Sequence, residues 1–319
     1  MPIKTHNLFT VPGTSIPLVE TPKGQRGKGA KGQRKLVSSD NQYCFPIIDS
    51  VPNFLTDSND STLMADQGGK QKVPFKYIDH YEKDAEYFDY FELPTDGATL
   101  HEHRRLHEMI LRAIPGSAAS VLDVGCGGAW LAQALSDSDL TVVSFDAAHK
   151  NTTTAIKRFP SEKHFAATGD ANHLPFADDS FDTIVSAEVI EHVPIVSIYL
   201  DSLLRVLKPG GRLILTTPYN ETIQYSLCIH CNRQTPLHAH LRSFNEKTLE
   251  RYVSGRGDIT CTPTTFSNKA LLLLRMHTLL KFFPHKFWLG IDKIANKVVA
   301  KPIRLMYILD KSYRPINET

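Results

Sequence analysis

Long apolar segments are missing from this sequence of 319 residues. The most apolar segment, residues 270–283, is interrupted by Arg275, His277 and Lys281 and falls short of the ~18 consecutive apolar residues of a transmembrane helix. The opening residues 1–6 have no apolar run behind them, so the pattern of a signal peptide is also missing. The sequence therefore predicts a cytoplasmic protein without a transmembrane segment.

The sequence also has few cysteines and a small net charge. The five cysteines, at positions 44, 126, 228, 231 and 261, include only one close pair. This number excludes a disulfide-stapled scaffold and fits a reducing compartment. There are 36 basic and 34 acidic residues, which give a formal net charge of +2. A protein that binds nucleic acid mainly through its overall charge is therefore excluded, although a local basic patch is not.

Residues 1–78 are expected to form a small N-terminal region. Within it, residues 22–39 consist largely of Gly, Gln, Lys and Arg without one acidic residue, which predicts a flexible basic loop. Such a loop is either a solvated linker or a contact for RNA or a phosphorylated substrate. Residues 43–55 differ, because a short apolar strand leads into a proline-bounded turn and a second apolar anchor.

From residue 120 onward, short apolar runs alternate with amphipathic stretches of helical length. The alternation predicts a parallel sheet with helices on both faces, which is an α/β fold. The expected strands are 121–124, 141–145, 164–168, 181–187 and 212–217, and the expected helices include 130–135, 155–159 and 195–207.

The first of these strands runs directly into Gly125, Gly127 and Gly128. Glycines let the backbone turn sharply and let a ligand approach the chain closely, beside the amides of the next helix. A dinucleotide fingerprint needs a sixth-position glycine, where Trp130 stands here. Asp123, two residues before the first glycine, also suits a cationic ligand better than a phosphate.

Two further carboxylates end successive strands. Asp146 follows the second strand, 21 residues after Gly125, where a carboxylate can accept both hydroxyls of a ribose. Asp170 follows the third strand, where it can accept from an adenine amino group. Each aspartate taken alone is also consistent with a turn or cap residue. Their joint placement at one sheet edge predicts a nucleoside-binding site.

Four motifs in order, 121–127, 169–182, 186–193 and 204–211, resemble the type 11 branch of the class I S-adenosylmethionine-dependent methyltransferases. The resemblance implies a Rossmann-like doubly wound sheet of seven strands, mainly parallel with an antiparallel last strand. Residues 79–319 would form this domain, with 258–266 and 303–309 as its last strands and insertions at about 220–243 and 269–302. The cofactor-binding residues that it implies are Asp123, Gly125, Cys126, Gly127, Asp146, Ala147, Asp170, Ala171 and Ala187. In one departure from the family, Ala129 stands where a third glycine is usual.

The run Glu188-Val189-Ile190-Glu191-His192 lies where methyl acceptors bind in this family. Its spacing would place Glu188, Glu191 and His192 on one face of a helical turn. One interpretation is capping and hydrogen bonding after a strand, and another makes Glu188 and His192 the catalytic base or orienting residues. The run also resembles the metal-binding run of ubiquinone-pathway O-methyltransferases and of small-RNA 3′-terminal methyltransferases. That resemblance implies a divalent metal held by Glu188, Glu191, His192 and His240.

A second group of residues, two cysteines and two histidines, suggests a different metal site. Cys228 and Cys231 are followed by His238 and His240, which are ligand types suited to structural zinc. His240 is thus assigned either to this zinc site or to the site with Glu191 and His192.

The flanking regions carry weaker signals. Residues 43–55 resemble the closing half of the zinc ribbon that often precedes these methyltransferases, but its cysteine pairs are absent. The segment 269–304 has eight basic residues against Asp292 alone. It predicts either a helical lid with a solvated face or a surface that contacts an anionic membrane or an acidic substrate.

Together these features predict a methyltransferase that transfers the methyl group of S-adenosylmethionine to a small-molecule acceptor, with oxygen as the expected acceptor atom. The alternatives are an RNA methyltransferase and a non-catalytic cofactor-binding module that contacts a partner.

Overall fold

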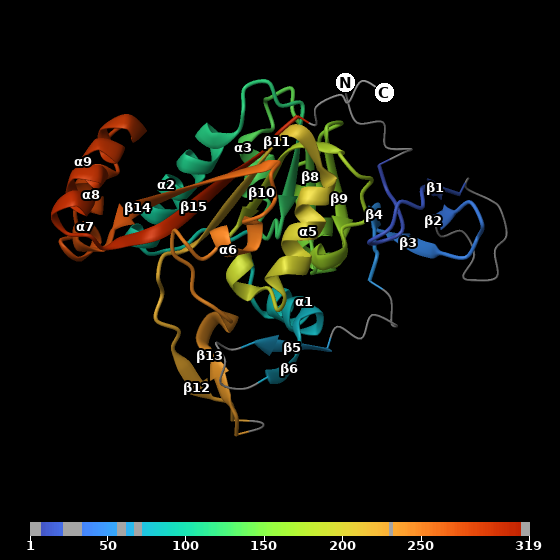
Figure 1. The fold of residues 1–319 in the computed structure, drawn as a ribbon, viewed down its shortest axis with the longest axis horizontal. Coiled ribbons are helices and arrows are strands. Elements are labelled where there is room, and N and C mark those ends of the chain that lie inside the picture. The colour runs from blue at the N-terminus through green and yellow to red at the C-terminus, as the bar shows by residue number, and fades with distance from the viewer. Residues whose placement is uncertain (1–7, 22–33, 56–61, 67–71, 230–231, 314–319) are drawn as a thin grey trace.

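A computed structural model describes residues 8–21, 34–55, 62–66, 72–229 and 232–313 (Figure 1). Its centre is one seven-stranded sheet with the strand order β14–β15–β11–β10–β7–β8–β9. Every neighbouring pair is parallel except the two pairs that include β15, which is antiparallel to β11 and to β14. The predicted seven-stranded, mainly parallel sheet with an antiparallel last strand is therefore confirmed. The strands are β7 (Ser120–Val124), β8 (Thr141–Asp146), β9 (His164–Thr168), β10 (Phe181–Ala187), β11 (Leu207–Pro218), β14 (Ile259–Asn268) and β15 (Pro302–Lys311).

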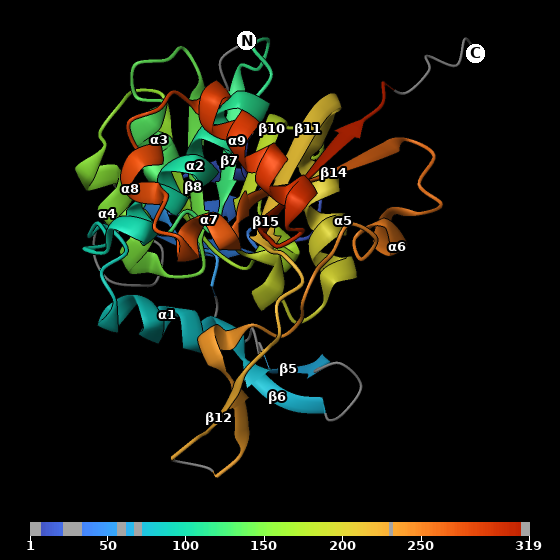
Figure 2. The ribbon, with the colours of Figure 1, turned by 90° about the vertical axis from the view of Figure 1, so that its left-hand side faces the viewer.

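Helices cover both faces of this sheet (Figures 1 and 2). One apolar cluster joins α5 to the sheet through Tyr199 and Leu203, and a second joins α2 and α9 to it through Ile110 and Trp288. The helices are α1 (Tyr77–Tyr87), α2 (Gly97–Ala113), α3 (Trp130–Ala134), α4 (His149–Arg158), α5 (Val196–Val206), α6 (Glu250–Val253), α7 (Lys269–Leu273), α8 (His277–Leu280) and α9 (His285–Val298), with 3₁₀ turns at Ala171–His173, Ile190–His192 and Leu237–Ala239.

The N-terminal region forms a separate antiparallel sheet of β1 (Leu18–Glu20), β2 (Lys35–Ser38), β3 (Cys44–Ile48) and β4 (Val51–Pro52). The prediction of a flexible loop over 22–39 is wrong at its end, because β2 pairs with both β1 and β3. The rest of that loop, residues 22–33, lies outside the described residues. Cys44, in the segment that resembles half of a zinc ribbon, is exposed and unbridged.

This N-terminal sheet is attached to the edge of the central sheet. The amide of Phe54 donates to the carbonyl of Thr168 at the end of β9, at 2.9 Å. The ring of Phe54 is 2% exposed and packs against Phe9 and Phe45, and Phe9 in turn packs against Phe176 of the central domain. The N-terminal region thus pairs with the end of β9, so this edge strand is not unpaired along its whole length.

The two segments expected as insertions contain secondary structure of their own. The first contains the hairpin of β12 (Tyr225–Leu227) and β13 (Gln234–Pro236), and the second contains α7, α8 and α9. The first hairpin lies at the same end of the molecule as α1 and the hairpin of β5 (Thr62–Asp66) and β6 (Lys72–Lys76) (Figures 1 and 2). In the part of the chain that the structure describes, no helix has the length and apolarity needed to cross a bilayer.

Candidate functional site

Two adjoining cavities open at the carboxyl ends of the parallel strands. The first, of about 210 Å³, is lined by the loops after β7, β8, β9 and β10 and is covered by α1. The second is larger, about 1140 Å³, and lies between α1, α2, the start of β15 and residues 233–241. Tyr81, Tyr90, Glu188 and His192 line both cavities. A ligand in the first cavity could therefore react with a ligand in the second.

The glycine loop after β7 forms the floor of the first cavity. Gly125 has a φ of +73°, and its amide donates to the carbonyl of Phe145 at 2.8 Å. Gly128 has a different requirement, since a Cβ at that position would lie 2.1 Å from the carbonyl oxygen of Tyr90. Ala129, the departure from the family pattern, adopts a φ of +51° with its methyl group fully buried in a small apolar cluster. The substitution of alanine for the usual glycine is thus accommodated.

Asp146 connects this loop to the end of β8. One carboxylate oxygen accepts from the amide of Gly127 at 2.9 Å, and the other accepts from the amide of Ala148 at 2.8 Å. Asp146 and Ala147, two of the residues expected to bind the cofactor, both line the first cavity. Burial raises the pKa of the Asp146 carboxyl, and the two amide donors oppose that shift.

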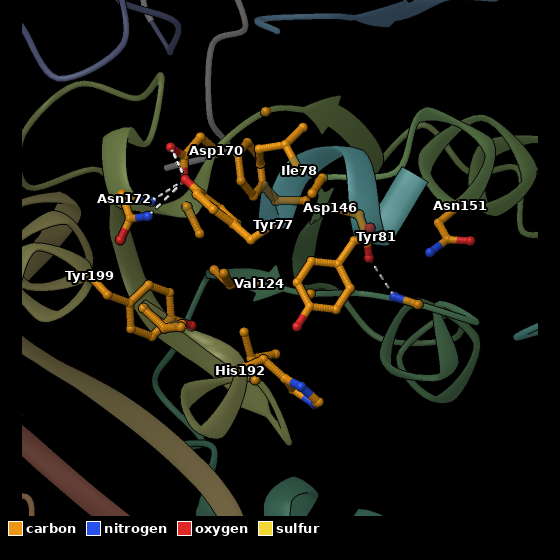
Figure 3. Close-up of a pocket in the computed structure, with 18 of the residues that line it drawn as sticks. Tyr77, Ile78, Tyr81, Val124, Asp146, Asn151, Asp170, Asn172, His192 and Tyr199 are labelled. Atoms are coloured by element: carbon orange, nitrogen blue, oxygen red, sulfur yellow. Dashed lines mark hydrogen bonds between the residues drawn. The ribbon is translucent and has the colours of Figure 1, made fainter. Parts of the chain in front are cut away.

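The opposite end of the cavity is formed by Asp170 and two tyrosines of α1. Figure 3 shows Tyr77 extending to Asp170 and Asn172, and its hydroxyl donates to the Asp170 carboxylate. Tyr81, one helical turn further, points into the cavity toward His192 (Figure 3). Neither tyrosine was predicted from the sequence to line the site, although their spacing of four residues was the available signal. Ala171, another residue expected to bind the cofactor, also lines this end.

Three of the predicted cofactor residues lie behind the cavity rather than in its lining. Asp123 is 1% exposed and Cys126 is 2% exposed, while Ala187 packs against the cluster beneath α2. Burial and, to a lesser extent, the nearby Asp146 raise the pKa of Asp123 to about 7. One oxygen of Asp123 has no hydrogen-bond partner among the described residues, so this carboxylate is available to a cationic group or a water.

The second cavity holds a cluster of three potential metal ligands. One ligand atom each of Glu191, His192 and His240 lies within 4.8 Å of the other two. Glu221 Oε2 lies 2.5 Å from Nδ1 of His240, which directs Nε2 of that ring away from Glu221. The Nδ1 of His192 donates to the carbonyl of Ala239 at 3.3 Å, which leaves its Nε2 available as an acceptor or ligand.

The cluster fits a divalent cation. Glu191 is 1% exposed, and neither of its carboxylate oxygens has a hydrogen-bond partner in the described part of the chain. Desolvation raises the pKa of Glu191 to about 8 and lowers the pKa of His192 to about 3. The second shift favours neutral imidazole, the form that binds metals. A cation beside Glu191 would favour the ionised form of its carboxyl group and would interact with the two carboxylate oxygens that have no hydrogen-bond partner.

Glu188 lies apart from this cluster. It has a φ of +57° ahead of the 3₁₀ turn Ile190–His192, so the predicted placement of all three side chains on one helical face is wrong for Glu188. Its carboxylate forms an ion pair with Arg304 at the start of β15, and its Oε1 has no hydrogen-bond partner among the described residues. The structure therefore assembles three of the four predicted ligands.

The alternative zinc site is not assembled within the described residues. The only cluster of potential ligands found there includes neither Cys228 nor His238. Cys231 lies outside the described residues.

Residues 122–215 match the family model of the methyltransferase domain named Methyltransf_11. With the fold and the two cavities, this match defines the region as a class I S-adenosylmethionine-dependent methyltransferase domain. The ubiquinone biosynthesis O-methyltransferase of Agrobacterium fabrum is 34% identical over 114 residues, which cover 34% of this chain and 44% of that protein. The mitochondrial enzyme of the same name from Mus musculus is 34% identical over 125 residues, which cover 36% of this chain and 33% of that protein. The chain thus spans less than half the length of either relative.

The solved structure of phosphoethanolamine N-methyltransferase 2 from Haemonchus contortus, in complex with S-adenosyl-L-methionine, has a similar fold. The alignment has a TM-score of 0.50 at 18% identity and covers 77% of this chain and 62% of that chain. At this identity the likeness is one of fold.

Proposed function

We propose that this protein transfers the methyl group of S-adenosylmethionine to a hydroxyl group of a small-molecule acceptor. The observation that carries the proposal is the pair of adjoining cavities, with the glycine loop and Asp146 in the first and the Glu191–His192–His240 cluster in the second. In the reaction, the bond between sulfur and the methyl carbon breaks as the bond to the acceptor oxygen forms. S-adenosylhomocysteine leaves, and the acceptor loses the proton of its hydroxyl.

The first cavity is proposed to bind the cofactor. Asp146 and Ala147 would hold the ribose, and Asp170 with Ala171 would contact the adenine. Asp123, Gly125, Cys126 and Gly127 would form the surroundings of the methionine part, with Ala187 behind them. The hydroxyl of Tyr77 donates to the Asp170 carboxylate, so an adenine amino group would share this acceptor with Tyr77.

The second cavity is proposed to bind the acceptor. Glu191, His192 and His240 would hold a divalent cation, which would acidify and orient the acceptor hydroxyl. Glu188, which pairs with Arg304 and lines both cavities, would accept the proton of the acceptor hydroxyl. This division gives the two residues predicted as catalytic different tasks, with His192 as a ligand and Glu188 as the base.

The test is turnover across a panel of small hydroxylated acceptors, followed as S-adenosylhomocysteine formed. We expect activity with added Mg²⁺ or Mn²⁺ that is lost with a chelator and in Glu191→Gln and His240→Asn. Glu188→Gln should lower kcat by about 10² or more with metal content unchanged. Turnover that survives the chelator and both ligand substitutions would show that the cation has no part in the reaction.

A further inference from the structure

The helices α7, α8 and α9 form a layer on one side of the molecule, at the left in Figure 1 and toward the viewer in Figure 2. The inner face of this layer is well packed. Trp288 is 2% exposed within the apolar cluster under α2, and the Asp292 carboxylate accepts from the amide of Ser267 in β14 at 3.0 Å. These contacts fix α9 against the sheet.

A buried arginine anchors the rest of the layer. Arg105 of α2 is fully buried and donates to the carbonyls of Leu280 and Phe283, at 2.6 and 3.0 Å. Glu108 neutralises Arg105 at 2.7 Å. Because the inner contacts hold the helices in place, the outward side chains are not needed for packing within this chain.

The outer face of α9 carries two parallel rows of side chains. One row is basic, with Lys286, Lys293 and Lys297 all exposed. The other is apolar, with Phe287, Ile294 and Val298 exposed by 52%, 64% and 78%. Both rows repeat at i, i+7 and i+11, so each keeps one side of the helix, and the lysines run beside the apolar row for its whole length.

The two shorter helices extend this pattern. Leu273, Leu274, Leu279 and Phe282 are between 57% and 77% exposed. Lys281 lies over the ring of Phe282, 5.0 Å from its centroid. We call the exposed apolar and basic side chains of residues 273–298 the α7–α9 surface. Its charge has one sign, because the only acidic residue of this segment, Asp292, is 1% exposed on the inner face.

We propose that the α7–α9 surface docks on an anionic lipid bilayer. An apolar row flanked by lysines on a helix held parallel to a surface is the pattern of helices that lie in the membrane interface. The apolar side chains would enter the boundary between headgroups and acyl chains, and the lysines would contact the lipid phosphates. A second copy of this chain is a less favourable partner for this surface, because a two-fold contact would place the lysine row of one copy against the lysine row of the other.

Docking in this orientation would place the membrane-bound helix α9 only a few residues along the chain from the lining of the second cavity. The chain leaves α9 at Val298 and enters β15 at Pro302, and the next residues, Ile303 and Arg304, line that cavity. The inference concerns a surface outside both cavities, however, and its test measures no methyl transfer. Its failure would leave the proposed function standing, and the reverse also holds.

The experiment is flotation of the full-length protein with two kinds of vesicle, pure phosphatidylcholine and phosphatidylcholine with roughly 30 mol % phosphatidylglycerol. We expect binding only to the second kind, weakened by high salt. Replacing the basic row by Lys286→Gln, Lys293→Gln and Lys297→Gln should lower the partition coefficient on the order of 100-fold. Ile294→Ser with Val298→Ser should also weaken binding to these vesicles.

The matched control removes three other exposed lysines, by Lys157→Gln, Lys163→Gln and Lys247→Gln, which lie on or beside other elements. This control should bind as the unaltered protein does. Circular dichroism should show that the outer-face variants stay folded, and light scattering should show that their mass is unchanged. The proposal would be overturned by no binding to the anionic vesicles, by equal loss in the control variant, or by a dimer that Ile294→Ser with Val298→Ser dissociates.

Discussion

Individual side chains at the two cavities are held by few contacts, so single substitutions separate their roles. Glu221 is such a residue, because its Oε2 lies 2.5 Å from His240 Nδ1 while Glu221 itself is not one of the three clustered ligands. It acts as a positioning residue that fixes which ring nitrogen of His240 faces Glu191 and His192.

Glu221→Leu should therefore weaken Mn²⁺ binding by about 10- to 100-fold, because the His240 ring would lose its orienting partner. Glu221→Gln, which keeps an acceptor oxygen, should retain most of the affinity. Calorimetric titration with Mn²⁺ measures both effects. Glu246→Leu, an exposed carboxylate near Tyr219, is the control and should bind Mn²⁺ normally. Equal Mn²⁺ affinity in Glu221→Leu and in this control would contradict the assigned role.

Gly128 is required at its position because the surrounding backbone leaves no room for a Cβ atom. Gly128→Ala would place a Cβ 2.1 Å from the Tyr90 carbonyl oxygen, so the segment before α2 or the glycine loop must move. We expect a loss of about 2 kcal/mol in the free energy of unfolding and weaker binding of S-adenosylhomocysteine. Denaturant unfolding and calorimetry provide the two measurements. Gly257→Ala, where a Cβ would have no neighbour within 4 Å, should change neither.

Among the elements, the junction between α2 and the helical layer has an unusual basis, since a buried arginine rather than an apolar residue fills it. Arg105 and Arg104 both donate to backbone carbonyls of the layer and both pair with Glu108. They differ in burial, with Arg105 side-chain exposure at 0% and Arg104 at 49%.

Arg105→Ala should cost about 3 kcal/mol of the free energy of unfolding, because two carbonyls and Glu108 lose a buried donor. Arg104→Ala should cost less than about 1 kcal/mol, because solvent replaces its contacts. Hydrogen exchange should show faster exchange in α8 and α9 only for the first variant. Similar unfolding free energies for the two variants would be inconsistent with this account of the junction.

Local sequence patterns predicted the elements whose own residues show that they are buried. Strands such as β7 and β8 are buried along their whole length, so they appear in the sequence as short apolar runs. The end of the basic segment 22–39 was mispredicted, because β2 is stabilised by pairing with β1 and β3 rather than by its own composition. Tertiary contacts of this kind leave little trace in a local pattern.

The same distinction applies to the site. The glycine loop, Asp146 and Asp170 follow strand ends and could be placed from the sequence. The position of Tyr77 depends on how α1 folds over the sheet edge, which no nearby residue determines. Glu188 was placed with Glu191 from helical spacing, whereas its positive φ and the distant Arg304 turn it away.

At the scale of the whole molecule, the N-terminal sheet and the central domain share one core. Phe54 is buried between them, and its amide continues the edge of β9. A shared aromatic cluster of this kind predicts that the two parts unfold together.

Phe54→Ala should lower the free energy of unfolding by about 3 kcal/mol and leave a single cooperative transition at a lower midpoint. Tyr43→Ala, a partly exposed aromatic beside the same N-terminal sheet, should have little effect. Circular dichroism and tryptophan fluorescence should report the same midpoint. Two separate transitions in the unaltered protein would contradict the shared core.

The central claim, a cofactor site built on the glycine loop and Asp146, is tested most directly by calorimetric titration with S-adenosylhomocysteine. The unaltered protein should bind one equivalent, and Asp146→Ala should lose at least about tenfold in affinity while it remains folded. The result that would contradict the claim is no binding by the unaltered protein, or equal affinity in the two proteins.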